Sequence, residues 1–188
     1  MPEINSTMLK DPAVFLDRDG TLIEDVGFIK QTSEVRFFPF TFKALKMLQE
    51  HFLLFIITNQ SGIAKGITTK KEVSEVNNFI IASLKTQNIA IHDLYCCPHK
   101  DEDNCACKKP KTLFIEKASQ LYNIDLSRSF IVGDHPSDVQ CGLNAGINPV
   151  YLLTGHGRKH YDELNKDTVI CQNLLEATNH IIRKFKHI

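Results

Sequence analysis

The sequence has no excess of charge of either sign, since its 188 residues include 22 Lys and Arg and 22 Asp and Glu. It therefore carries no basic surplus of the kind that marks a nucleic-acid-binding protein. No apolar run approaches the roughly 20 residues that a membrane-spanning helix needs. The stretch Met1–Asp11 has no basic segment followed by an apolar one, as a secretory signal would have. These absences favour a cytoplasmic protein without a nucleic-acid or membrane partner, and we take a monomer as the default.

The chain also lacks internal repeats, low-complexity segments and any change of composition that would mark a domain boundary. Its length suits one domain with a sizeable core, so we expect a single domain over residues 1–188. Apolar runs alternate with segments of helical periodicity, which indicates an α/β protein with a doubly wound, mostly parallel sheet. The expected strands cover residues 13–17, 52–58, 89–96, 130–132, 149–153 and 168–171. The expected helices cover residues 41–50, 69–87, 112–122, 137–145 and 174–184, and the second of them begins with a capping box, Thr69 and Glu72.

Four of the six cysteines gather in a short segment of the chain, between positions 96 and 107. Three of these and one histidine have the ligand types and number of a tetrahedral zinc site: Cys97, His99, Cys105 and Cys107. Four protein ligands leave no open position, so the zinc would be structural and would hold the polar loop 97–107 together. The rival interpretation is a group of reduced, free cysteines at a strand end. Alternation along the strand turns Cys96 to the other side, and Cys141 and Cys171 have the character of small buried apolar residues.

Residues 13–23 form a short apolar run that stops on two carboxylates, Asp17 and Asp19, and then breaks at Gly20. Such a run predicts a buried strand, and ligands of a parallel sheet lie at the carboxyl ends of its strands. Two carboxylates held close together repel each other unless a proton or a cation intervenes. A hard divalent cation with oxygen ligands, Mg²⁺, explains the pair. The rival interpretation is an ordinary Asp-Gly turn.

Two further strands are also followed by polar residues, Thr58 and Asn59 after one and Asp134 after the other. Asp138 follows one helical turn later, and Lys109 stands near the start of an expected helix. Each of these alone is weak evidence. Together they supply what phosphoryl transfer through a carboxylate requires: a nucleophile, an acid, a metal site and donors for the phosphoryl oxygens.

The motifs in this order resemble those of the haloacid dehalogenase-like superfamily, whose members are mostly phosphatases. The motifs are Phe-Leu-Asp-Arg-Asp-Gly-Thr-Leu at 15–22, Thr-Asn-Gln-Ser-Gly-Ile-Ala-Lys-Gly at 58–66, the Cys-Pro-His…Cys-x-Cys-Lys-Lys-Pro segment at 97–110, and Val-Gly-Asp at 132–134. They are similar to those of the branch that holds the D-glycero-D-manno-heptose 1,7-bisphosphate 7-phosphatases and the histidinol-phosphate phosphatases. The resemblance implies a haloacid dehalogenase-type fold, a small phosphorylated metabolite as substrate, and hydrolysis through an aspartyl-phosphate.

The resemblance also implies a role for each residue that matches a motif. Asp17 would be the nucleophile and Asp19 the acid and base, while Thr58 and Lys109 would stabilise the transferring phosphoryl group. Mg²⁺ would be bound by Asp17, Asp134 and the carbonyl oxygen of Asp19, with Asp138 in a supporting position. No large cap is inserted between the motifs, so we expect an open site under a flap within residues 18–33. The expected substrate-binding residues are Asp25, Val26, Gly27, Phe28, Asn59, Gln60, Ser61, Lys108 and His135.

Two substrates fit this branch, and different features favour each. The five residues between His99 and Cys105 resemble the histidinol-phosphatase form, whereas the run at 152–157 and the flap at 25–28 resemble the heptose form. The branch usually has Arg where this chain has Lys108, and often Lys where it has His135. Lys lacks the planar fork of Arg, and His carries less charge at neutral pH.

Three readings outside this branch compete with it. A phosphoacceptor signalling domain would retain the phosphoryl group instead of turning it over. An interaction module built around zinc would leave the Asp, Thr and Lys positions unexplained. A polynucleotide end phosphatase is disfavoured by the balanced charge and by the absence of a P-loop motif.

Overall fold

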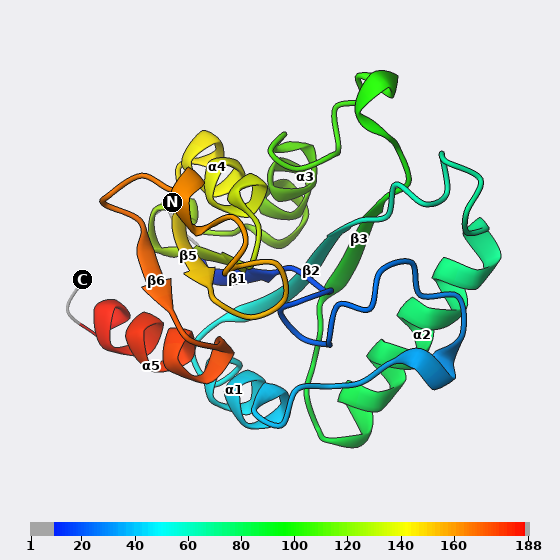
Figure 1. The fold of residues 1–188 in the computed structure, drawn as a ribbon. Coiled ribbons are helices and arrows are strands. Elements are labelled where there is room, and N and C mark those ends of the chain that lie inside the picture. Colours follow the sequence, from blue (N-terminus) through cyan, green and yellow to red (C-terminus); the bar gives the residue numbers. More distant parts are fainter. Residues whose placement is uncertain (1–9, 187–188) are drawn as a thin grey trace, which may run out of the picture.

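The computed structural model describes residues 10–186, which form one six-stranded sheet with helices on both sides (Figure 1). All neighbouring strands are parallel, in the order β3-β2-β1-β4-β5-β6. The strands are β1 (Ala13–Leu16), β2 (Leu53–Asn59), β3 (Asp93–Cys97), β4 (Phe130–Gly133), β5 (Asn148–Leu152) and β6 (Val169–Cys171). The α-helices are α1 (Thr41–Leu48), α2 (Lys70–Thr86), α3 (Leu113–Tyr122), α4 (Pro136–Ala145) and α5 (Leu174–Phe185).

The helices divide into two layers, and each layer closes one hydrophobic cluster against the sheet. Alternate side chains of β1, such as Val14 and Leu16, pack with α1, α2 and α5, whereas Ala13 and Phe15 pack with α3 and α4. The central strands read as unbroken apolar runs because both of their faces are covered. The predicted doubly wound α/β sheet is therefore confirmed.

The chain reverses its direction across the sheet at β1. It moves outward from β1 to β2 and β3, then returns to place β4 on the other side of β1. In open parallel sheets, a crevice for ligands forms at the carboxyl ends of the strands at such a switch point. Asp17 follows β1 and Asp134 follows β4, so the topology brings two of the sequence motifs to this crevice.

The structure places most element boundaries within a few residues of the expected ones. Helix α2 has the expected capping box, in which Glu72 N–H donates to Thr69 Oγ1 at 3.1 Å and Thr69 N–H to Glu72 Oε2 at 2.6 Å. The largest difference is β3, which begins at Asp93 rather than at residue 89. Ile89 is buried without belonging to a strand, because its side chain packs into the core from the connection after α2.

The ends of the chain lie outside the described residues. The structure does not describe positions 1–9 and 187–188 of the expected domain, so most of the stretch Met1–Asp11 lies outside it. Among residues 10–186, no helix has both the length and the apolar character that a membrane crossing would require.

Candidate active site

A cavity of about 660 Å³ lies at the carboxyl ends of β1, β2 and β4. The flap after β1, the loop after β3 and the loop after β5 each contribute residues to its lining. Ten of the expected site residues line it, and these eight are among them: Asp17, Asp19, Thr58, Asn59, Ser61, Lys108, Lys109 and Asp134. Asp25, His135 and Asp138 line it as well. Residues spread over more than a hundred positions of the chain therefore share one cavity.

Asp17 is fixed from both its backbone and its side chain. Its backbone N–H donates to Val132 O at 2.9 Å, which continues the pairing of β1 with β4. Its carboxylate pairs with the ammonium of Lys109, which is 4% exposed. Burial, opposed by Lys109 and reinforced by Asp138, raises the pKa of Asp17 to about 7.

Lys109 is held by three oxygen acceptors. Its Nζ contacts Asp17, lies 2.6 Å from Asp138 Oδ1 and donates to Ile57 O at 2.9 Å. Although burial acts against the charged form, Asp138 and Asp17 raise the pKa of Lys109, so its ammonium stays charged. The site therefore contains a fixed positive charge beside the candidate nucleophile.

The side-chain amide of Asn59 positions Lys109. Its Oδ1 accepts from Lys109 N–H at 3.1 Å, and its Nδ2 donates to Lys109 O at 3.2 Å. Asn59 was expected to bind substrate directly. In the structure its amide binds the backbone of Lys109, because β2 ends beside the segment that carries Lys109, and Asn59 also lines the cavity.

Three carboxylates come together around the same point. One oxygen from each of Asp17, Asp134 and Asp138 lies within 4.8 Å of the others, a spacing that could hold a metal ion. We call these three residues the carboxylate cluster. Burial, together with the charges of Asp17 and Asp138, raises the pKa of Asp134 to about 8. A single Lys109 faces three acids within the described chain, so a divalent cation would restore the charge balance.

Two glycines make room for the carboxylate of Asp134. A Cβ added at Gly20 or at Gly155 would lie 2.1 Å from Asp134 Oδ2, and both glycines have positive φ angles. The loop after β5 also binds this group, since His156 N–H donates to Asp134 Oδ2 at 2.7 Å. Thr154 Oγ1 donates to Gly20 O at 2.6 Å and ties the two glycine turns together.

Asp19 has different partners from Asp17, although the two are two positions apart. Its Oδ2 accepts from Gln60 Nε2 at 2.8 Å and lies 3.5 Å from Thr58 Oγ1. Gln60 was expected to bind substrate, but it is 8% exposed and bonds to Asp19 and Thr58 instead. The side chain of Asp19 is therefore held apart from the carboxylate cluster, yet it faces the same cavity.

The flap meets the cavity through one of its four expected residues. Asp25 lines the cavity, and its Oδ2 lies 2.9 Å from His156 Nε2 in the loop after β5. Val26 is 53% exposed and Phe28 is 43% exposed, and Gly27 forms the turn between them with φ +88°. These three residues are not part of the cavity lining, and the Phe28 ring packs on Gly62.

His135 caps the first turn of α4. Its Nδ1 accepts from Ser137 N–H at 3.2 Å, and burial lowers its pKa. It was expected to bind substrate with less positive charge than the Lys that is common in the branch, and in the structure it lines the wall of the cavity. Lys108 lies at the rim, where its Nζ is 2.6 Å from Asp101 Oδ1.

Four further Lys and His side chains line the cavity without having been assigned a role from the sequence. They are Lys65, His156, Lys159 and His160. His156 belongs to a polar run that follows β5, and the carboxyl end of a fifth parallel strand was a usable signal. Lys65 belongs to the motif at 58–66, whereas Lys159 and His160 lie in a loop with no local pattern that would have singled them out.

The Cys/His cluster, formed by Cys97, His99, Cys105 and Cys107, could also hold a metal ion. Five of its interatomic distances lie between 3.2 and 3.7 Å. A tetrahedral zinc site with bonds of about 2.3 Å spaces its ligand atoms roughly 3.5–3.8 Å apart. Cys96 lies on the other side of β3 and takes no part in the cluster.

The Cys/His cluster is joined directly to the cavity. Cys97 pairs with Asn59 across β3 and β2, and Gln60 N–H donates to Cys97 O at 2.7 Å. At its other end the loop runs from Cys107 into Lys108 and Lys109. The loop therefore positions two lysines of the cavity.

Comparisons with known proteins identify relatives along almost the whole chain. A family model described as HAD-hydrolase-like matches residues 106–177. The D-glycero-beta-D-manno-heptose-1,7-bisphosphate 7-phosphatase of Helicobacter pylori is 37% identical over 171 residues, which are 90% of this chain and 96% of the relative. The D-glycero-alpha-D-manno-heptose-1,7-bisphosphate 7-phosphatase of Campylobacter jejuni is 35% identical over 146 residues, 77% of this chain and 84% of the relative.

Solved structures share the fold. The D,D-heptose 1,7-bisphosphate phosphatase from B. bronchiseptica, complexed with magnesium and phosphate, is 28% identical with a TM-score of 0.84, covering 92% of this chain and 99% of its own. A 2-haloacid dehalogenase from Pseudomonas syringae is 13% identical with a TM-score of 0.59, covering 94% of this chain and 100% of its own. The second similarity shows a common fold alone.

Proposed function

This chain belongs to the haloacid dehalogenase-like phosphatases, and we propose that it removes the 7-phosphate of D-glycero-D-manno-heptose 1,7-bisphosphate through an aspartyl-phosphate on Asp17. The observation that carries this proposal is the buried Asp17 paired with Lys109, beside Asp134 and Asp138, in an open cavity. An ordinary core would not hold three carboxylates and one ammonium in contact, because burying charge is unfavourable without a compensating function.

The reaction consists of two displacements at phosphorus. A carboxylate oxygen of Asp17 attacks the phosphorus atom, and the bond from phosphorus to the sugar oxygen breaks while Asp19 gives that oxygen a proton. Water then attacks the aspartyl-phosphate and loses a proton to Asp19, and the bond between phosphorus and Asp17 breaks. Asp19 thus returns to its starting protonation state, and inorganic phosphate leaves.

The remaining side chains stabilise charge in these displacements. Lys109 supplies a fixed ammonium next to the reacting carboxylate, and Thr58 offers its hydroxyl at the end of β2. Asn59 keeps Lys109 in place through its backbone. Lys108 and Ser61 line the part of the cavity where the rest of the substrate would lie, together with Asp25.

The donor set fits a magnesium ion. Asp17 and Asp134 would bind it with carboxylate oxygens, the carbonyl oxygen of Asp19 would add a third ligand, and Asp138 would support them while pairing with Lys109. Bound magnesium neutralises the carboxylates and polarises the phosphoryl oxygens. The magnesium and phosphate in the B. bronchiseptica relative support this choice of metal.

The Cys/His cluster fits structural zinc. Three thiols and one imidazole at tetrahedral spacing leave no position for a substrate, so the ion would act only on the loop. Zinc would fix the path of the chain into Lys108 and Lys109. Thiols that bind a metal must stay reduced, which suits a reducing compartment, so we place the protein in the cytoplasm. We also propose that it acts as a monomer.

One experiment decides the substrate. Phosphate release with Mg²⁺ is measured for both anomers of the heptose 1,7-bisphosphate and for histidinol phosphate, with Asp17→Asn as the inactive control. We expect kcat/KM to favour a heptose anomer by about 100-fold, or roughly 2.7 kcal/mol of transition-state stabilisation. The short spacing between His99 and Cys105 favours histidinol phosphate. A kcat/KM that favours histidinol phosphate by about 100-fold would replace the heptose assignment.

A further inference from the structure

Arg18 is a buried cation that lies directly behind Asp19. It is 1% exposed, and its guanidinium approaches the carboxylate of Asp19 in a fork: Nε donates to Oδ2 and Nη2 donates to Oδ1, each at 2.9 Å. A planar fork of this kind fixes both oxygens of a carboxylate and therefore its plane. Within residues 10–186, Asp19 is the only carboxylate in an ion pair with Arg18.

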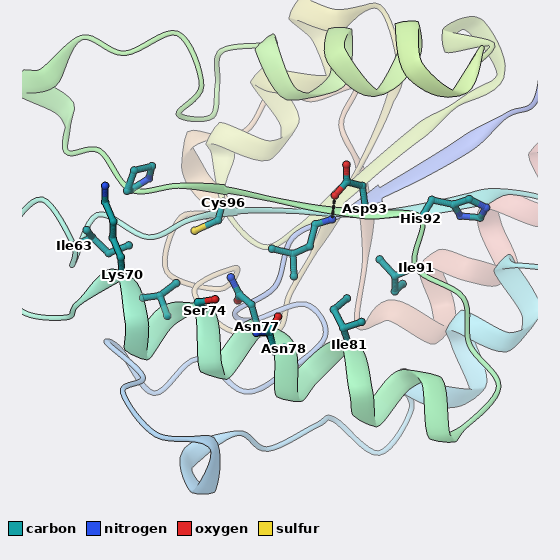
Figure 2. Close-up of a pocket in the computed structure, with 13 residues that line it drawn as sticks. Ile63, Lys70, Ser74, Asn77, Asn78, Ile81, Ile91, His92, Asp93 and Cys96 are labelled. Carbon is teal, nitrogen blue, oxygen red and sulfur yellow. Dashed lines mark hydrogen bonds between the residues drawn. The ribbon is translucent and has the colours of Figure 1, made fainter.

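The third contact of Arg18 comes from a distant helix. Its Nη1 donates to Asn77 Oδ1 at 2.7 Å, and Asn77 lies on α2 with 8% of its surface exposed. Figure 2 shows Asn77 reaching from α2 toward β3, on the side of Cys96, in a cavity of about 570 Å³ between the two elements. The mechanism described above does not use Arg18 or Asn77.

We propose that Arg18 and Asn77 are positioning residues for Asp19, an inference that rests on the proposed phosphatase function. Asn77 anchors one nitrogen of Arg18, and this anchor orients the remaining fork on the carboxylate of Asp19. Through these two contacts, helix α2 sets the direction of the group that exchanges the proton.

The cost of burying Arg18 argues against a purely space-filling role. A buried ion pair is often no more stabilising than apolar residues of the same volume, because both charges lose their water. An apolar side chain would fill this site without that penalty. What the guanidinium adds is direction, since it fixes both oxygens of its neighbour.

The hydrogen bonds of Asp19 also indicate which oxygen exchanges the proton. Within the described residues, Oδ2 accepts from Arg18 Nε and Gln60 Nε2 and lies 3.5 Å from Thr58 Oγ1. Oδ1 accepts a single bond, from Arg18 Nη2. Because each carboxylate oxygen has two lone pairs, Oδ1 is the oxygen with a lone pair left for the proton.

The test compares two substitutions of Asn77 that differ in whether they keep an acceptor for Arg18. Asn77→Leu removes the acceptor for Arg18, whereas Asn77→Asp keeps an oxygen acceptor in the same place. Asn78→Leu is the matched control, because Asn78 is the next residue of α2 and lines the same cavity without a bond to Arg18. Arg18→Met removes the fork itself, and far-UV circular dichroism and melting temperature establish which variants are folded.

Two measurements separate positioning from a general structural defect. The first is kcat with Mg²⁺ on whichever phosphate ester the unaltered protein hydrolyses fastest. The second is the affinity for beryllium fluoride, which binds an active-site carboxylate as a phosphoryl mimic and needs no proton transfer. We expect Asn77→Leu to lower kcat about 10-fold and Arg18→Met about 100-fold, within the range of general acid–base catalysis. The affinity for beryllium fluoride should stay within twofold, and Asn77→Asp should restore most of the rate.

Three outcomes would overturn this inference. The first is an Asn77→Leu variant with the kcat of Asn78→Leu. The second is a parallel loss of kcat and beryllium fluoride affinity, which would indicate a structural role. The third is an Asn77→Asp variant as slow as Asn77→Leu. Failure of the proposed function is distinct from all three, because the unaltered protein would then release no phosphate from any of the esters.

Discussion

The carboxylate cluster and the Cys/His cluster are both candidate metal sites, but the chain builds them in opposite ways. The carboxylate cluster gathers Asp17 from the end of β1 and Asp134 and Asp138 from the end of β4 and the start of α4. The Cys/His cluster takes all its members from residues 97–107. Elements of the sheet and its helix layer position the first cluster, whereas the second lies in a polar loop. Metal should therefore serve chemistry in the first and order in the second.

The largest expected effect is a loss of kcat when the carboxylate cluster is changed, without a change in zinc content or fold. Asp17→Asn should lower kcat on the order of 10,000-fold, because the neutral amide cannot form the aspartyl-phosphate. Bound zinc, measured by elemental analysis, and the far-UV spectrum should not change. Glu24→Gln, an exposed neighbour in the flap, is the control for loss of one charge. A substantial rate in a verified Asp17→Asn preparation would show that another group is the nucleophile.

A smaller effect should arise when the Cys/His cluster is broken. Cys107→Ser should lose zinc and lower kcat/KM by about 10- to 100-fold, because a displacement of Lys109 on the order of 1 Å costs up to about 100-fold in rate. Zinc content and phosphate release are measured on the same preparation. Cys96→Ser changes the neighbouring thiol outside the cluster and should have neither effect. Unchanged rates in zinc-free protein would show that the two clusters are independent.

The two clusters should also respond to pH with opposite signs. The pKa values of Asp17 and Asp134 are raised in the fold to about 7 and about 8, so the folded protein holds protons that the unfolded chain releases. That contribution to stability is full below about pH 4 and is lost as pH rises through 7 and 8. Zinc binding requires deprotonated ligands and so stabilises more as pH rises.

Magnesium distinguishes the pH dependence of stability that comes from the carboxylate cluster from the pH dependence that comes from the Cys/His cluster. In zinc-loaded, magnesium-free protein, the melting temperature should be about 5 °C lower at pH 8 than in the matched Asp134→Asn variant, with a smaller difference at pH 6. Added Mg²⁺ should abolish the difference in the unaltered protein, because the cation replaces the protons. Equal melting temperatures of the two proteins at both pH values would contradict the claim that ionised Asp134 destabilises the metal-free cluster.

The smallest expected effect concerns the residue that joins the two clusters. Lys108 lines the cavity but pairs with Asp101 of the Cys/His loop, at a site where the Asp101 carboxylate is largely exposed. An exposed ion pair contributes about 1 kcal/mol or less. Asp101→Asn should free Lys108 for an anionic substrate and lower KM about twofold, without changing zinc content. Asp103→Asn, in the same loop, serves as the control, and a raised KM would show that the ion pair holds Lys108 in its useful position.

The two clusters also differ in how far the sequence could predict them. Local spacing was sufficient for Cys97, His99, Cys105 and Cys107, because a loop brings near neighbours together whatever the rest of the fold does. Asp17, Thr58 and Asp134 needed a further step, the rule that parallel strands end at one edge, and Lys109 was found through the resemblance to a known family. The roles of Asn59 and Gln60 could not be predicted, since their amides bind protein groups whose positions depend on strand register. Arg18 and Asn77 are 59 positions apart, and no periodicity connects them.

The contact of Gly20 and Gly155 with Asp134 affects how the sequence can vary. In a library of single substitutions, both positions should tolerate no side chain, even though a glycine offers no group for catalysis. A selection for growth would score such variants with the misfolded ones. Supplying excess Mg²⁺ would distinguish them, because a displaced Asp134 weakens affinity for the ion, which a higher concentration offsets, whereas a misfolded chain does not recover. Glycines that pack on a proposed metal ligand thus form a class of their own, because the effect of substituting them depends on the Mg²⁺ concentration of the medium.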